Sequence, residues 1–88
     1  MNKKIKDWEE EFIEKGASLE HERWAGWQKY LHSLCVRNDD GSLTIPVEKV
    51  KRWEKQIKAK YSELTEQEKE SDRIEVRKYL SLLEEMEL

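Results

Sequence analysis

Residues 18–34, SLEHERWAGWQKYLHSL, decide the fold because their apolar side chains recur at the spacing of an α-helix. These side chains lie three to five residues apart on one broad face: Leu19, Trp24, Trp27, Tyr30, Leu31 and Leu34. Ser18 is a typical helix N-cap, and the carboxylates that follow it suit a first helical turn. We therefore expect a helix that begins at Ser18 and buries its aromatic rings in the core.

A shorter amphipathic helix is predicted ahead of this segment, over residues 8–15. Trp8, Phe12 and Ile13 fall on one side of it, with acidic residues between them. Gly16 follows directly, and glycine often ends a helix because it adopts positive φ without steric cost. The sequence therefore predicts a helix boundary at Gly16.

The chain is expected to reverse direction after Leu34. Residues 37–42, RNDDGS, form a run typical of a turn, in which Asp40-Gly41 favours positive φ. Apolar and polar residues alternate on both sides of the run, which predicts a short β-hairpin near residues 34–45. Pro46 then suits the first turn of a new helix, with Thr44 as the candidate cap.

The segment 47–60 is predicted to be a helix with one apolar and one basic face. Its apolar stripe consists of Val47, Val50, Trp53 and Ile57. Six cations against two acids give the segment a net charge of +4, whereas the remainder of the chain carries −7. A solvated lysine-rich face and an anion-binding surface are both compatible with this pattern.

A last helix is predicted to begin at Thr65, because Thr65 and Glu68 form a capping box. Its apolar stripe runs toward the C-terminus as Ile74, Val76, Tyr79, Leu80, Leu83 and Met86. The sequence thus predicts a mainly α fold. We expect one small domain over residues 1–88, of about four helices with a short β-hairpin.

Composition limits what the chain can do. Of 88 residues, 42% are charged and 36% are hydrophobic, so we expect a small core that depends on four tryptophans and three tyrosines. A core this small also favours self-association, so we expect a homo-oligomer. The single cysteine, Cys35, and the lack of a long apolar run predict a cytoplasmic protein without membrane contact.

No catalytic or metal-binding pattern stands out in the sequence. His32 and Cys35 have a spacing that two metal ligands on a helix use, but no second pair follows, and structural zinc needs four ligands. Glycine-rich phosphate loops and serine elbows do not occur. We therefore expect a protein that is not an enzyme and that holds no metal or cofactor.

Two motifs resemble those of the ryanodine-receptor-type (RyR) domain. Residues 20–24, EHERW, are similar to its first helix signature, and residues 61–73, YSELTEQEKESDR, resemble its second. Together they span a region of about residues 18–84. The middle of the chain lacks the family's usual segments, which leaves the identity of any ligand open.

This resemblance implies a compact fold of paired helices and a non-enzymatic role. Small stand-alone members occur in bacteria and their phages. The resemblance therefore implies a protein of the bacterial cytoplasm, encoded by the bacterium or by a phage, with a role in phage–host conflict. There the protein would bind, and sequester, a nucleotide-derived signal. Side chains suited to stacking on a base or binding phosphate form the expected ligand site: His21, Trp24, Gln28, Trp53, Tyr61, Lys69 and Arg73.

Two other functions compete with nucleotide binding. A protein-interaction adaptor would use an exposed aromatic and charged helix face. A nucleic-acid-binding protein would use the basic helix 47–60, but it must overcome the charge of −7 elsewhere in the chain. Nucleic acid is therefore the least expected partner.

Overall fold

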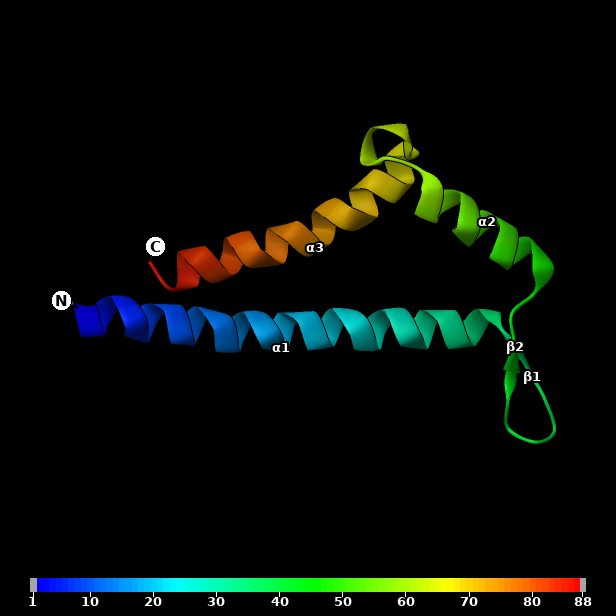
Figure 1. Cartoon of the computed structure of the whole chain (residues 1–88), viewed down its shortest axis with the longest axis horizontal. Coiled ribbons are helices and arrows are strands. Elements are labelled where there is room, and N and C mark those ends of the chain that lie inside the picture. Colours follow the sequence, from blue (N-terminus) through cyan, green and yellow to red (C-terminus); the bar gives the residue numbers. More distant parts are fainter. Residues whose placement is uncertain (1, 88) are drawn as a thin grey trace.

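The computed structural model describes the backbone of residues 2–87 and the side chains of residues 7–87. Its elements, in chain order, are helix α1 (Asn2–Leu34), strands β1 (Val36–Arg37) and β2 (Leu43–Thr44), helix α2 (Val47–Lys58), the 3-10 turn η1 (Tyr61–Glu63) and helix α3 (Glu66–Glu85). The predicted mainly helical fold is confirmed (Figure 1). Residues 2–87 form three α-helices, whereas about four were predicted.

The predicted helix boundary at Gly16 is wrong, because α1 continues through this residue without a break. The ring of Tyr79 from α3 lies so close that a Cβ atom at Gly16 would be 3.7 Å from Tyr79 Cε1. This distance is an ordinary van der Waals contact, so Gly16 lies against the ring of Tyr79 within α1 and does not end a helix. Ser18 lies within α1 and has no helix start to cap.

The predicted hairpin is confirmed. Its strands pair antiparallel, with Val36 opposite Thr44 and Arg37 opposite Leu43. Gly41 takes a φ of +89° in the turn, and the Asn38 amide donates to the hydroxyl oxygens of Ser42 (3.0 Å) and Thr44 (2.9 Å). The expectation that Thr44 caps α2 is wrong, because Pro46 holds the N-cap position and no side chain caps this helix.

The predicted start of α3 is also confirmed. The hydroxyl of Thr65 accepts a hydrogen bond from the Glu68 amide (3.1 Å), and the Glu68 carboxylate accepts one from the Thr65 amide (2.9 Å). This capping box satisfies two amides that would otherwise lack partners. The chain therefore leaves η1 and enters α3 at a fixed point, which sets the direction of α3.

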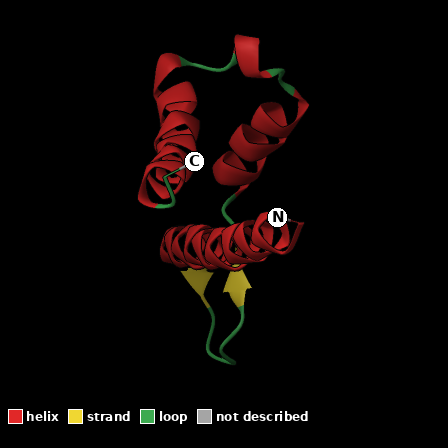
Figure 2. Ribbon diagram, turned by 90° about the vertical axis from the view of Figure 1, so that its left-hand side faces the viewer, coloured by secondary structure: helices red, strands yellow, loops and turns green. Residues whose placement is uncertain are grey.

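The helices form an open, flat frame. In Figure 1, α3 runs back along the N-terminal half of α1, while α2 closes the far side of a triangle; Figure 2 shows α2 and α3 as two arms on one side of α1, with the hairpin on the other. The molecule measures 56 × 36 × 18 Å, and its radius of gyration is 17.9 Å. A compact chain of this length has a radius of gyration of roughly 12 Å.

The core lies where α1 meets α3, which we call the closed end (residues 8–20 of α1 and 79–86 of α3). Leu82 is the hydrophobic side chain buried there, with 5% of its surface exposed. The open end comprises residues 21–34, α2 and η1. The expectation that aromatic rings form the core is wrong: Trp24 is 60% exposed and Trp27 46%, so the other helices leave both rings largely uncovered.

Candidate functional site

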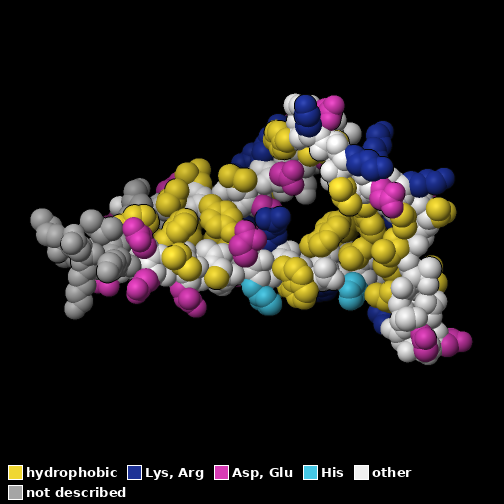
Figure 3. Space-filling view, in the orientation of Figure 1, with side chains coloured by type: hydrophobic (Ala, Val, Ile, Leu, Met, Phe, Trp, Pro, Cys, Tyr) yellow, Lys and Arg dark blue, Asp and Glu magenta, His cyan; other side chains and the backbone are white. Residues whose placement is uncertain are grey.

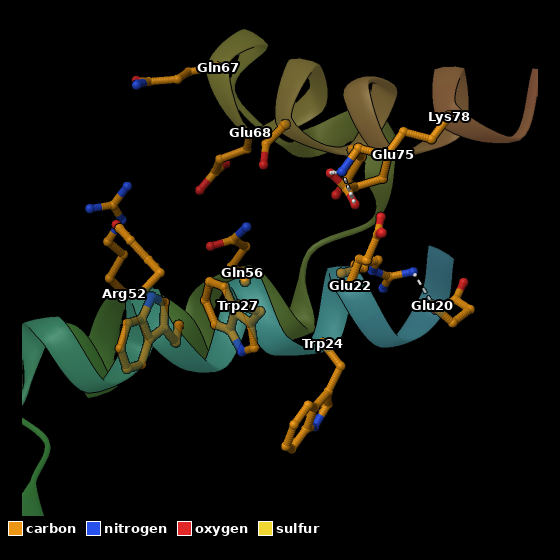
Figure 4. A pocket seen from close by; sticks show the side chains of 16 residues that line it. Glu20, Glu22, Trp24, Trp27, Arg52, Gln56, Gln67, Glu68, Glu75 and Lys78 are labelled. Carbon is orange, nitrogen blue, oxygen red and sulfur yellow. Dashed lines mark hydrogen bonds and ion pairs between the residues drawn. The ribbon is translucent and has the colours of Figure 1, made fainter. Parts of the chain in front are cut away.

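An open cleft lies between the three helices at the open end. It has a volume of about 710 Å³, and Figure 3 shows it as a hollow bounded by α1, α2 and α3. Side chains from all three helices line it, among them Trp27 and Tyr30 of α1, Arg52, Trp53 and Gln56 of α2, and Glu68, Asp72, Glu75 and Lys78 of α3 (Figure 4).

One wall of the cleft is aromatic. The Trp27 and Trp53 rings meet edge to face, with centroids 5.8 Å apart and an interplanar angle of 66°. Tyr30, one helical turn after Trp27, lies 5.6 Å from it in a tilted arrangement. Such ring pairs stabilise a fold by roughly 0.5–1.5 kcal/mol beyond the free energy gained by burying their surfaces. This cluster fastens α2 to α1 and leaves Tyr30 46% exposed.

The remaining lining is charged, with an excess of acid. Five carboxylates and three cations line the cleft: Glu20, Glu22, Glu68, Asp72 and Glu75 with Arg23, Arg52 and Lys78. Two of the cations already have carboxylate partners, Lys78 with Glu75 at 3.1 Å and Arg23 with Glu20 at 3.5 Å. The cleft therefore repels anions and favours a cationic ligand.

The seven predicted site residues fall into separate places. Trp24 and Trp53 both line the cleft, but the Trp24 ring points away from α3 (Figure 4) and stacks with His21, at a centroid distance of 6.0 Å. Gln28, one turn further along α1, is half-buried and lies outside the cleft lining. Of the predicted aromatic side chains, only Trp53 faces the Trp27 ring.

Tyr61, Lys69 and Arg73 form a second cluster, at the junction of η1 and α3. The Lys69 ammonium lies 5.7 Å from the centroid of the Tyr61 ring and 3.8 Å from a Glu66 carboxylate oxygen. The Arg73 guanidinium contacts Glu66 at 3.1 Å and Glu70 at 3.4 Å. None of these three residues lines the cleft. The structure thus separates them from Trp24 and Trp53.

The cations of this second cluster already have partners. Arg77 donates to Glu70 at 2.6 Å, and this hydrogen bond lowers the pKa of the Glu70 carboxyl. The hydrogen bond to Glu66 likewise raises the pKa of the Arg73 guanidinium. A phosphate group at Arg73 must therefore compete with two carboxylates for the same donors.

The sequence singled out neither Trp27 nor Tyr30 as site residues, because their helical spacing is typical of a core face. Only the divergence of α1 and α3 turns this face into a cleft wall. The half-buried thiol of Cys35 donates to the Leu31 carbonyl oxygen at 3.2 Å. Among the described residues, no three His, Cys, Asp or Glu side chains are grouped to hold a metal ion.

None of the helices within residues 2–87 combines the length and apolar character needed to cross a bilayer. No protein-family model, curated protein or solved structure matches this chain. The resemblance to the RyR domain therefore depends on the two motifs alone and stays a prediction.

Proposed function

We propose that this chain is a non-enzymatic protein-interaction module whose aromatic cleft binds an apolar segment of a protein partner. The observation that carries the proposal is the exposed ring cluster, in which Trp27 and Tyr30 each remain 46% exposed although they pack against neighbouring rings. Tryptophan, tyrosine and arginine dominate the binding energy of protein interfaces, and Arg52 stands beside this cluster.

The charge of the cleft specifies the partner further. Acidic residues outnumber basic ones in the lining, so a segment with apolar anchors and flanking lysines or arginines would be complementary. The same excess of negative charge disfavours the binding of a nucleotide, whose phosphates are also negatively charged. For this reason the geometry favours a protein partner over the nucleotide-derived ligand that the sequence motifs suggest.

Paired alanine substitutions at the open end test the proposal. Tagged protein is produced in the cells from which the gene comes, and co-purifying proteins are quantified by mass spectrometry. We expect one stoichiometric partner, lost from Trp53→Ala because the cleft wall is removed. Trp24→Ala is the matched control: its ring points out of the cleft, so the partner should be retained.

A second experiment, with small molecules, distinguishes this function from nucleotide binding. The purified protein is heated to release bound compounds, and nucleotides are screened for a rise in Tm. We expect neither a released compound nor a thermal shift. A shift that disappears in Arg73→Ala and persists in Trp53→Ala would contradict the proposal and support the second cluster as a nucleotide site.

A further inference from the structure

We infer that a second copy of this chain binds face to face and end for end, as a two-fold symmetric dimer. The inference goes beyond the proposed function, because it concerns the flat face and the charged ends of the frame, whereas the cleft is the site proposed for an apolar segment of another protein. The inference follows from the large surface that one chain leaves exposed, and from the opposite charges at the two ends of the frame.

The exposed surface of one chain is too large for a compact monomer. The chain exposes 7651 Å², whereas a folded monomer of 10.7 kDa exposes about 5,500 Å². The difference is about 2,000 Å² per chain, which reaches the range that permanent dimers bury. Figure 3 shows apolar side chains along one face, from the closed end to the contact between α1 and α2.

The flat shape agrees with stacking. One chain is 18 Å thick and 36 Å wide, so two stacked frames give a particle about as thick as it is wide. Helices are about 10–12 Å in diameter, so a single frame has no room for an interior layer. Stacking encloses the faces of both frames and provides the interior that one frame lacks.

Charge fixes the orientation of the second copy. The closed end, together with the residues that continue its two helices (2–20 and 79–87), carries nine acidic side chains against four lysines, a net charge of −5. At the open end, residues 47–60 carry +4. A two-fold axis perpendicular to α1 sets the acidic end of each copy beside the basic α2 of the other. A parallel stack would instead place like charges together.

Charge-reversal variants test both the dimer and its orientation. Light scattering coupled to size exclusion should give a dimer for the wild type. Lys51→Glu/Lys55→Glu and Glu10→Lys/Glu14→Lys reverse exposed charges at opposite ends, so each variant alone should be monomeric. A mixture of the two should form heterodimers, because one contact keeps the native charges on both sides and the other pairs the introduced lysines with the introduced glutamates.

A second measurement uses the wild type alone, which guards against variants that fail to fold. Isotope-labelled and unlabelled protein are mixed, and carboxylates are coupled to lysines with a zero-length reagent. We expect cross-links of mixed isotope composition between residues 7–15 and residues 47–60. Wild type that stays monomeric at every concentration, or a variant mixture that stays monomeric while both variants are folded, would overturn the inference.

Failure of the dimer is distinguishable from failure of the proposed function. If the wild type is monomeric but a different stoichiometric protein is lost from Trp53→Ala, only the second copy is ruled out. If no other protein is lost from Trp53→Ala, the proposed function fails, whether or not the wild type forms a dimer.

Discussion

The closed and open ends of the frame are built from the same helix, α1, yet they differ in how closely a second helix approaches it. At the closed end, Gly16 and Tyr79 bring the backbone of α1 near α3, and Leu82 is buried between them. At the open end, the rings of Trp27 and Trp53 meet edge to face, with centroids 5.8 Å apart, and form the contact between α1 and α2. A glycine against a ring thus marks the closed end, and a contact between two large rings marks the open end.

This difference indicates that the closed end stabilises the fold, whereas the open end provides the surface for binding. The buried Leu82 at the closed end stabilises the fold through packing, which needs no partner. Large rings at the open end are only partly covered, so much of their apolar surface is free to stabilise a complex. Substitutions at the two ends should therefore have separable effects.

The largest expected effect is at the closed end. Leu82→Ala removes the one side chain that is almost fully buried among the described residues, and we expect the free energy of unfolding to fall by about 2–5 kcal/mol. Urea unfolding at a fixed protein concentration measures it. The matched control is Leu80→Ala: Leu80 is 55% exposed in the same helix, so the loss should stay below about 1 kcal/mol. Equal losses would contradict Leu82 as the buried core residue of the closed end.

The next effect concerns the ring contact at the open end. In a double-mutant cycle of Trp27→Ala and Trp53→Ala, we expect a coupling energy of about 0.5–1.5 kcal/mol, because each ring loses its edge-to-face partner. Thermal unfolding of the four proteins gives the coupling. A cycle of Trp24 with Trp53 should show none, since the Trp24 ring points the other way. Coupling in both cycles would mean that the rings form one core.

The sequence predicted the local elements well, because each has a signal within a few residues. The capping box fixed the start of α3, and Asp40-Gly41 fixed the hairpin turn. It failed at Gly16, where a glycine next to an acidic, amphipathic segment suggested a helix end. Gly16 instead lies in mid-helix against the ring of Tyr79, sixty-three positions later, and no local pattern carries such information.

The candidate site was harder to predict, because helical spacing tells which residues share a face but not what covers it. Trp53 was expected to line a ligand cleft, and it does. Tyr61 and Arg73 were expected at the same cleft, but η1 and the first turns of α3 hold them in a separate ion network. Trp27 has the periodicity of a core residue, so its place in the cleft wall depends on how far α1 and α3 diverge.

A smaller effect, of opposite sign, is expected at Gly16. Gly16→Ala should raise the free energy of unfolding by about 0.5–1 kcal/mol, because alanine favours the helix and its Cβ atom finds an ordinary contact with Tyr79 at 3.7 Å. Thermal unfolding measures the gain. Gly26→Ala is the control in the same helix, with open space around the new Cβ atom. A loss at Gly16 with a gain at Gly26 would indicate the helix end that the sequence suggested.

The smallest effect makes the contact between α3 and α1 depend on pH. The Tyr79 hydroxyl donates to the Glu20 carboxylate at 2.5 Å, and this hydrogen bond raises the pKa of the Tyr79 phenol above its ordinary value of 10.0. Because the folded-state pKa is the higher one, the stabilising contribution is complete below pH 10.0 and is lost as the pH rises through the folded-state pKa. Tyr79→Phe should abolish this alkaline loss and keep the ring against Gly16.

Unfolding free energies measured across the alkaline range for wild type and Tyr79→Phe check the last expectation. The two curves should converge as the pH rises, because ionised Tyr79 cannot donate to Glu20 and is repelled by it. Glu20→Gln should behave differently: it keeps an acceptor for the phenol but removes the charge, so the alkaline loss should shrink without disappearing. Parallel curves for all three proteins would show that the hydrogen bond between Tyr79 and Glu20 does not hold the closed end together.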